Sequence, residues 1–191
     1  MARLSANNLV TAQAIIARYP KPRSALVPLC HLAQEQDGYL ANDAMEHIAE
    51  LIGCTAAQVY GTASFYEMFK LHPVGKYLVG VCTNISCMLN GGYELLEHCE
   101  RSLGVPVGGT TTDGMFTLEE VECSAACVVA PAVQVNYRYQ DNVTPESMDS
   151  LIAQLRAGTR DDIPVHGVLA TVRQTPTDRW ANTGQTGEHP E

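Results

Sequence analysis

The sequence has 191 residues, 46% of them hydrophobic, and a formal net charge of −9 at neutral pH. This composition suits one globular domain with room for a second, and the negative charge argues against a nucleic-acid partner, which requires a basic surface. No stretch approaches the ~20 consecutive apolar residues of a membrane-spanning helix, and residues 1–8 lack the apolar centre of a signal peptide. We therefore expect a cytoplasmic protein that is not inserted in a membrane and that docks on other proteins.

Residues 1–72 are predicted to form a helical domain. Apolar residues recur there at helical spacing, and the segments are bounded by proline, glycine or capping residues. Gly53 is placed to end one helix, and Thr55 with Gln58 matches a capping box that starts the next. The predicted helices are residues 9–19, a helix capped by Ser24 and ending at 37, residues 42–52, and a short helix from 56.

Residues 73–158 are predicted to form a small α/β domain. Runs of strand-forming residues alternate with helical patterns, which favours strands and helices packed in layers. The predicted strands are 76–81, 116–122, 132–136 and 137–139, the last two joined by a tight hairpin; the predicted helices are 87–103, with Leu89, Tyr93, Leu96 and Cys99 on its apolar face, and a final helix capped by Thr144. The fold class is therefore α+β, a helical bundle followed by an α/β domain.

Residues 159–191 are polar and rich in glycine, proline and threonine, and we expect an extended or disordered tail. Trp180 is its only tryptophan and its only large aromatic side chain. Docking on a partner and incidental exposure are both compatible with that residue.

Seven cysteines in a chain without an export signal indicate reduced thiols or metal ligands rather than disulfides. Their spacing singles out a C-x4-C pair, Cys82 and Cys87, and a C-x3-C pair, Cys123 and Cys127. Each pair directly follows a predicted strand, which can fix the sulfur positions while the loop exposes backbone N–H groups. Two such pairs brought together can hold an iron–sulfur cluster or a tetrahedral zinc ion.

The spacing alone leaves the choice of metal open. It matches neither of the common ferredoxin runs, whereas zinc sites commonly use pairs two to four residues apart. A dithiol redox site is disfavoured because no C-x-x-C occurs, and a Rieske-type site because no histidine lies within either loop. The other three cysteines are expected to pack in the core: Cys30, Cys54 and Cys99.

Both cysteine pairs lie in sequence contexts that resemble the NuoE family, the thioredoxin-like [2Fe–2S] subunits of respiratory complex I (NADH:quinone oxidoreductase). The resemblance covers about residues 10–157. The segments that carry it are 82–92, 113–131 and 135–136, with upstream segments 38–40 and 59–66.

This resemblance implies a thioredoxin-like second domain with one [2Fe–2S] cluster, whose four ligands carry over to Cys82, Cys87, Cys123 and Cys127. It implies that these same cysteines are the metal-binding and cofactor-binding residues, and that no catalytic residue lies on this chain. Pro131 resembles the proline that thioredoxin-like folds place in cis, although an X–Pro bond is usually trans.

The resemblance also implies a role as a subunit of an oxidoreductase. The expected partners are a flavin-bearing, NADH-binding subunit of the NuoF type, which carries FMN and oxidises NADH, and other iron–sulfur subunits. In the family the cluster lies off the main electron path, so storage, regulation and conduction of electrons all remain open. The chain would sit on the cytoplasmic face of the membrane through the complex. No G-x-G-x-x-G or P-loop sequence indicates a nucleotide site here.

Two alternatives remain at this point. The same kind of subunit occurs in the diaphorase module of an NAD-linked hydrogenase or formate dehydrogenase, and the residues do not separate these complexes. The second alternative is a zinc-stapled interaction module without a redox role.

Overall fold

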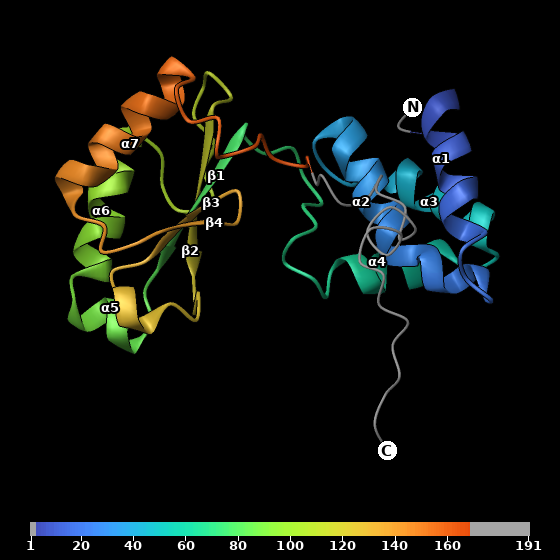
Figure 1. Cartoon of the computed structure of the whole chain (residues 1–191), viewed down its shortest axis with the longest axis horizontal. Coiled ribbons are helices and arrows are strands. Elements are labelled where there is room, and N and C mark those ends of the chain that lie inside the picture. The colour runs from blue at the N-terminus through green and yellow to red at the C-terminus, as the bar shows by residue number, and fades with distance from the viewer. Residues whose placement is uncertain (1–2, 169–191) are drawn as a thin grey trace, which may run out of the picture. The chain divides into compact units, whose positions relative to one another are not determined.

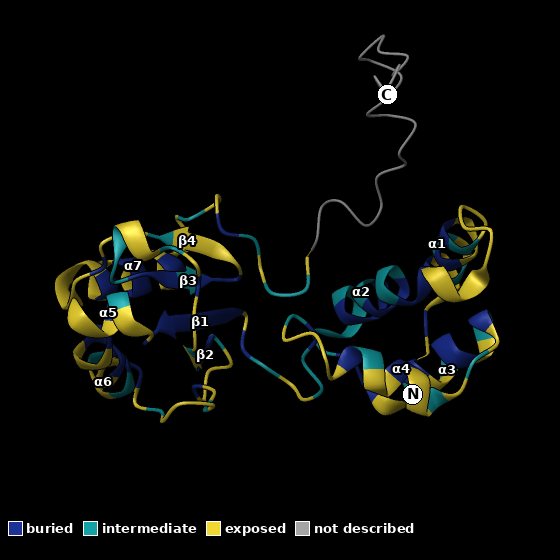
Figure 2. Ribbon diagram, turned by 90° about the horizontal axis from the view of Figure 1, so that it is seen from below, coloured by how far each residue is buried: buried dark blue, intermediate teal, exposed yellow. Residues whose placement is uncertain are grey.

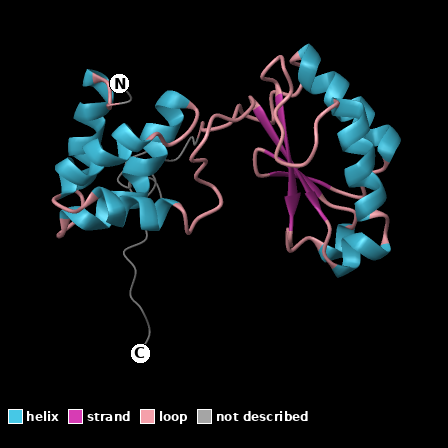
Figure 3. Ribbon diagram, turned by 180° about the vertical axis from the view of Figure 1, so that it is seen from behind, coloured by secondary structure: helices cyan, strands magenta, loops and turns pink. Residues whose placement is uncertain are grey.

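The computed structural model describes residues 3–168, which form two compact units that divide between Leu71 and His72 (Figure 1). The first unit is helical, and the second combines helices with a sheet (Figure 3). Among residues 3–168, no helix has the length and apolar character that crossing a lipid bilayer requires.

The first unit packs its helices around a core of fully buried side chains that includes Leu29, Ile48 and Val59. Gly38 and Gly53 end two of the helices in the left-handed conformation, which glycine adopts without a steric penalty. The elements are α1 (Ala6–Ile16), the 3-10 helix η1 (Pro22–Ala25), α2 (Leu26–Asp37), α3 (Asn42–Ile52) and α4 (Ala56–Ala63).

Two details of the first unit bear on the predicted elements. The capping box of Thr55 and Gln58 is present at the start of α4, as predicted. Ser24, in contrast, does not cap α2, because it lies within η1 and the α-helix begins only at Leu26. Proline at the first position of η1 has the backbone angle that a helical turn requires, so Pro22 starts that turn earlier than predicted.

The second unit is built on a four-stranded mixed sheet in the order β2-β1-β3-β4, in which β1 and β2 are parallel and the other neighbours antiparallel. Helices α6 and α7 cover one face of the sheet (Figures 1 and 3). Every residue of the central strand β1 is buried (Figure 2). The elements are β1 (Tyr77–Cys82), α5 (Ile85–Leu89), α6 (Gly92–Leu103), β2 (Phe116–Val121), the 3-10 helix η2 (Cys127–Val129), β3 (Val133–Val135), β4 (Arg138–Gln140) and α7 (Pro145–Ala157).

The helix predicted for residues 87–103 is wrong in one respect, because the chain forms two helices, α5 and α6, with a break at Gly91. Gly91 has φ +91°, and a Cβ on Gly92 would lie 2.8 Å from the carbonyl oxygen of Cys82. The chain therefore turns where only glycine fits, which ends α5 early. As a result, Leu89 and Tyr93 are exposed rather than buried, and Leu95 packs in the core.

The tail predicted from residue 159 also differs, because residues 159–168 pack on the second unit. Ile163 is only 3% exposed and belongs to the same core as α7. The backbone N–H of His166 donates to the Lys76 carbonyl at 2.9 Å, and the Asn136 amide donates to the Pro164 carbonyl at 2.8 Å. The rest of the predicted tail, with Trp180, lies outside the described residues.

Candidate metal centre

The sheet topology brings the two cysteine loops to the same edge. Strands β1 and β2 run parallel, with Cys82 paired opposite Val121, so the loops that follow them leave the sheet side by side. The backbone N–H of Thr83 donates to the Val121 carbonyl at 3.2 Å and extends this pairing by one residue. Cys123 follows two residues after the end of β2. The predicted placement of both pairs at strand ends is thus confirmed.

The first pair is buried at the end of β1. Cys82 and Cys87 are 3% and 2% exposed, and they form a small cluster with Ala132. Helix α5 carries Cys87, and Asn84 caps that helix through a 2.7 Å hydrogen bond from the Ile85 N–H. This short capped helix turns the chain back so that the two thiols of the pair meet.

The second pair lies in an exposed loop. Both Cys123 and Cys127 are exposed, and the Ala125 N–H donates to the Cys123 sulfur at 3.4 Å. Ala125 takes the left-handed conformation, with φ +57°. Cys127 begins η2, and the Ala130–Pro131 peptide bond that follows is cis, which answers the question that the sequence left open.

The thiols of the first pair, Cys82 and Cys87, act on each other directly, and the charge of Cys127 in the second loop reaches Cys87 through electrostatics. Within residues 3–168, no group of three or more His, Cys, Asp or Glu side chains has a metal-holding arrangement. The two cysteine loops share one edge of the sheet, and the complete ligand set remains a prediction.

Backbone hydrogen bonds favour a thiolate at Cys82. Burial is the largest single influence and acts to raise the pKa of this thiol, but hydrogen bonds from the backbone of Ser124 and Asn84, together with the Cys87 thiol, lower the pKa below its ordinary value. Of the four cysteines, Cys82 therefore has the surroundings that most clearly support a negative sulfur.

The pKa of Cys87 shifts in the opposite direction to that of Cys82. Burial raises the pKa of its thiol, and a backbone hydrogen bond from Ala132 opposes burial without cancelling it. The Cys82 thiol and the negative charges of Cys82 and Cys127 raise this pKa further. Such crowding of sulfur charges disfavours free thiolates and is relieved by a cation bound between them.

The donors around the loops fit a thiolate-bound metal centre. Backbone N–H groups serve the sulfurs of Cys82, Cys87 and Cys123, from Ser124 and Asn84, Ala132, and Ala125 respectively. An iron–sulfur cluster with four thiolates carries a net negative charge, and N–H donors stabilise that charge when the site is partly buried. A four-thiolate zinc site would use the same donors.

Exposed apolar side chains lie within or next to the two loops. Ile85, Met88 and Leu89 on α5 are 66%, 43% and 75% exposed, and Val128 in the second loop is 95% exposed. We call these four residues the apolar rim. Apolar side chains gathered around a functional site are typical of a surface that a protein partner covers.

The remaining cysteines take no part in this site. Cys30 and Cys99 are fully buried, and burial raises the pKa of each thiol to about 12, with smaller contributions from Cys54 and Asp149 respectively. The prediction that they pack in the core is confirmed. Cys54 is half-buried and packs against the same core as Cys30.

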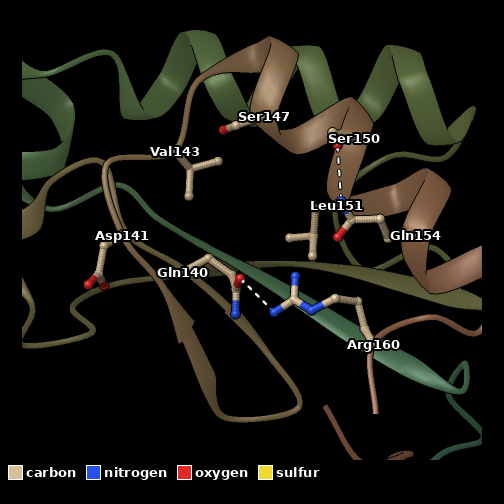
Figure 4. A pocket seen from close by; sticks show the side chains of 8 residues that line it. All are labelled: Gln140, Asp141, Val143, Ser147, Ser150, Leu151, Gln154 and Arg160. Carbon is tan, nitrogen blue, oxygen red and sulfur yellow. Dashed lines mark hydrogen bonds between the residues drawn. The ribbon is translucent and has the colours of Figure 1, made fainter. Parts of the chain in front are cut away.

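A pocket of about 290 Å³ lies between the β4 end and α7, away from the cysteines (Figure 4). Among its lining residues the cationic side chain is Arg160, which donates to Gln140 at 3.1 Å and to Asp162 at 2.7 Å. Because these two side chains already hold the guanidinium, this pocket offers no unpaired lining charge to recruit an anion. None of the seven cysteines lines it.

The sequence does not predict two hydrogen bonds, donated by side-chain hydroxyls, that organise the site. The Thr83 hydroxyl donates to the Glu120 carboxylate at 2.7 Å, and the Tyr139 hydroxyl donates to the Ser124 carbonyl at 2.8 Å. Thr83 and Ser124 neighbour ligand candidates in the sequence, which is a weak signal. Nothing in the sequence pattern indicates that Tyr139, on β4, reaches back to the second loop.

Comparison with known proteins places the chain among relatives of one kind. The family model described as thioredoxin-like [2Fe-2S] ferredoxin matches residues 12–156. An NADH-quinone oxidoreductase subunit of Mycobacterium tuberculosis is 46% identical over 167 residues, which cover 87% of this chain. The match covers 66% of that relative, so the chain spans just under two thirds of its length. An NADH-quinone oxidoreductase subunit of Rhizobium meliloti is 41% identical over 148 residues, 78% of this chain and 88% of the relative.

Solved structures of an NAD+-reducing [NiFe]-hydrogenase share the fold. In the air-oxidized state the TM-score is 0.64 at 20% identity, over 84% of this chain and 28% of that chain. In the H2-reduced state the TM-score is 0.62 at 21% identity, over 82% of this chain and 23% of that chain. At this level of identity the similarity establishes the fold alone.

Proposed function

Because the chain belongs to the thioredoxin-like [2Fe–2S] ferredoxin family, we propose that it is an electron-transfer subunit of an NADH:quinone oxidoreductase and holds one [2Fe–2S] cluster. The observation that carries this proposal is the meeting of two cysteine loops at one sheet edge, with backbone N–H donors for the sulfurs of both. Relatives at 41% and 46% identity are named as subunits of that enzyme.

The proposed ligands are Cys82 and Cys87 from the first loop and Cys123 and Cys127 from the second. When bound, the cluster supplies one-electron reduction and oxidation. The chain's own part is to hold the thiolates, to donate N–H groups to their sulfurs, and to keep the first pair out of water. The buried first pair and the exposed second pair make the second loop the side from which electrons would enter or leave.

We further propose that the apolar rim docks on a flavin-bearing, NADH-binding subunit, which would carry FMN and oxidise NADH. Two features support this. The rim lies directly beside the cysteine loops, so a protein that covered it would bring its own redox group near the cluster. The rim is also uncharged, which suits the centre of a protein interface. In this arrangement the chain reaches the cytoplasmic face of the membrane only through its partners.

The runner-up is the equivalent subunit of an NAD-linked hydrogenase or formate dehydrogenase. The hydrogenase structures support it only through the shared fold, whereas the relatives of higher identity favour NADH:quinone oxidoreductase. Purification of the tagged full chain from its native cells distinguishes the two. Co-purification with quinone-reductase subunits and NADH-dependent reduction support the proposal, and co-purification with a hydrogenase or formate dehydrogenase subunit rejects it.

The cluster itself is tested by anaerobic purification of the full chain. We expect a brown protein with about two iron atoms and two acid-labile sulfides per chain. Its visible absorption should bleach with dithionite, and reduction should produce the EPR signal of a spin-half centre. A colourless protein with one zinc ion would reject the cluster and leave the zinc-stapled module.

A further inference from the structure

Ser124 is a buried polar residue within the exposed second cysteine loop. It is only 4% exposed, although its neighbours Cys123 and Ala125 are exposed. Among residues 3–168, its hydroxyl oxygen has no hydrogen-bond partner. A buried hydroxyl without a partner costs stability, so its burial calls for an acceptor that becomes available in the working protein.

The acceptor that the site can supply to Ser124 is a sulfur of the metal centre. In the second loop Ser124 lies between two proposed ligands in the sequence, Cys123 and Cys127, and this loop leaves the sheet at the same edge as the first pair, because β1 and β2 run parallel. The Ser124 hydroxyl is buried, whereas both of these cysteines are exposed. Ligand sulfurs and cluster sulfides accept hydrogen bonds from donors of this kind.

Tyr139 fixes Ser124 in this position. Its hydroxyl donates to the Ser124 carbonyl at 2.8 Å, and β4, which carries Tyr139, is anchored in the sheet by pairing with β3. The next residue, Ala125, takes the left-handed conformation that turns the loop after Ser124. The loop is therefore tied to the sheet at the residue whose side chain points inward.

We propose that Ser124 is a positioning residue of the metal centre: its hydroxyl donates a hydrogen bond to a sulfur of the cluster or of its cysteine ligands and raises the reduction potential, and Tyr139 holds Ser124 in place. This inference rests on the proposed function, because it requires an iron–sulfur cluster on these cysteines.

Electrostatics determines whether the hydrogen bond raises or lowers the reduction potential. One-electron reduction adds a negative charge to the cluster, and part of that charge resides on the ligand sulfurs. A donated O–H group stabilises the reduced form more than the oxidised form, so its removal makes reduction less favourable. Ser124→Ala removes the O–H group and keeps the backbone N–H, which isolates the contribution of the hydroxyl.

The experiment is an EPR-monitored redox titration of the purified full chain with its cluster. Ser124→Ala should shift the midpoint potential to a lower value, and Ser124→Thr, which restores a hydroxyl, should return it toward that of the unchanged protein. Ser102→Ala removes a hydroxyl that bonds Asp149 on the helical face, and it should leave the potential unchanged. Tyr139→Phe should shift the potential in the same direction as Ser124→Ala, whereas Tyr93→Phe on α6 should not.

A second measurement detects the hydrogen bond itself. In the reduced protein exchanged into D2O, electron–nuclear double resonance should show an exchangeable proton that Ser124→Ala lacks and Ser124→Thr retains. If Ser124→Ala fails to hold the cluster, Tyr139→Phe carries the test, because it leaves Ser124 in the chain.

The outcomes separate the two proposals. An unchanged potential and an unchanged set of exchangeable protons in Ser124→Ala, with the cluster present, would overturn the role of Ser124 and leave the proposed function standing. If the unchanged protein holds no iron, the proposed function fails first, whatever the variants do. A lowered potential in Ser124→Ala that Ser124→Thr reverses supports both.

Discussion

The Thr83 hydroxyl donates a hydrogen bond of 2.7 Å to the Glu120 carboxylate. Thr83 directly follows Cys82, and Glu120 lies on the strand that leads to Cys123, so the bond joins the starting points of the two cysteine loops. Thr83 is buried and Glu120 is exposed, which places the bond at the edge of the site. The distance between the two proposed ligand pairs therefore depends on a hydrogen bond that joins the start of one loop to the strand before the other.

Replacing Thr83 with valine keeps the side-chain shape and removes the hydroxyl. We expect the free energy of unfolding to fall by about 1 kcal/mol, because Glu120 is exposed and water can replace the lost donor. Chemical denaturation of the metal-free chain measures this change. Thr83→Ser, which keeps the hydroxyl, should lose less stability than Thr83→Val; the reverse order would show that the hydrogen bond is not what Thr83 contributes.

Cys123→Ser should abolish or strongly reduce iron binding, because it removes a proposed ligand from an exposed loop. Cys99→Ala is the matched control, since Cys99 is fully buried under α7 and has no role in the site. Iron and acid-labile sulfide analysis after anaerobic purification compares the two. Equal loss of iron in both variants would contradict the ligand assignment.

Gly92→Ala should disrupt the site through the backbone. A Cβ at this position would lie 2.8 Å from the Cys82 carbonyl oxygen and 2.9 Å from the Cys87 carbonyl oxygen, neither of which can move without shifting a proposed ligand. We expect a loss of about 2 kcal/mol or more in the free energy of unfolding, with reduced iron content.

Gly61→Ala is the control for Gly92→Ala, since a Cβ there meets nothing within 4 Å and the residue lies inside α4. It should raise the free energy of unfolding by up to about 1 kcal/mol. A Gly92→Ala protein as stable and as rich in iron as Gly61→Ala would show that the close approach does not constrain the loop.

The stability of the helical unit should fall in mild acid because of His31. Burial lowers the pKa of His31 below its ordinary value of 6.5, and its ring packs against Phe69 at 4.6 Å. The unfolded chain therefore takes up a proton more readily than the folded chain. The contribution of neutral His31 to the free energy of unfolding is complete above about pH 6.5. It is lost as the pH falls through the lowered pKa of the folded chain.

Denaturation midpoints on either side of that range measure the effect. His31→Gln, which cannot take up a proton, should flatten the decline in stability below about pH 6.5. Part of the decline should remain, because burial, with the charge of Arg3, also lowers the pKa of His47. His72→Gln, at an exposed position, is the control. An identical pH profile for His31→Gln and the unchanged protein would rule out His31 as a source of the decline.

Ile163→Ala tests whether residues 159–168 belong to the second unit. Ile163 is 3% exposed in the core that α7 covers, so its truncation should lower the free energy of unfolding by about 2 to 4 kcal/mol. Val165→Ala, at a position 38% exposed, should cost much less. Equal and small effects would mean that the segment contributes little to the fold.

The helices of the first unit could largely be predicted because their signals are local. Gly53 and the Thr55–Gln58 capping box act within a few residues of their own positions, and both appear in the structure where the sequence indicates them. Ser24 misled the prediction for a similar reason, since Pro22 is an equally local signal that starts a different helical turn.

The breaks in the second unit could not be predicted because they depend on residues far apart in the chain. Gly92 must be glycine only because the Cys82 and Cys87 carbonyls lie against it, and helical spacing alone favoured one continuous helix. Ile163 is one apolar residue in a polar segment, and its burial depends on the core beneath α7.

The candidate site likewise contains some residues that the sequence identifies and others that only the fold reveals. The four cysteines could be selected from spacing and from resemblance, because ligand pairs are close in the sequence. The proposed role of Ser124 could not, because the Tyr139 hydroxyl that bonds the Ser124 carbonyl reaches the second loop only through the pairing of β4 with β3. Sequence spacing thus identifies candidate ligands, whereas the groups that adjust their chemistry emerge from the fold.

The central claim is that the two cysteine loops together bind a single [2Fe–2S] cluster. Native mass spectrometry of the full chain under anaerobic conditions tests it most directly, because the mass added to the polypeptide identifies the bound group. We predict the added mass of one [2Fe–2S] unit, lost when any of Cys82, Cys87, Cys123 or Cys127 is replaced by serine and kept when Cys99 is replaced by alanine. The added mass of a single zinc ion, or a cluster that survives each of the four serine substitutions, would contradict it.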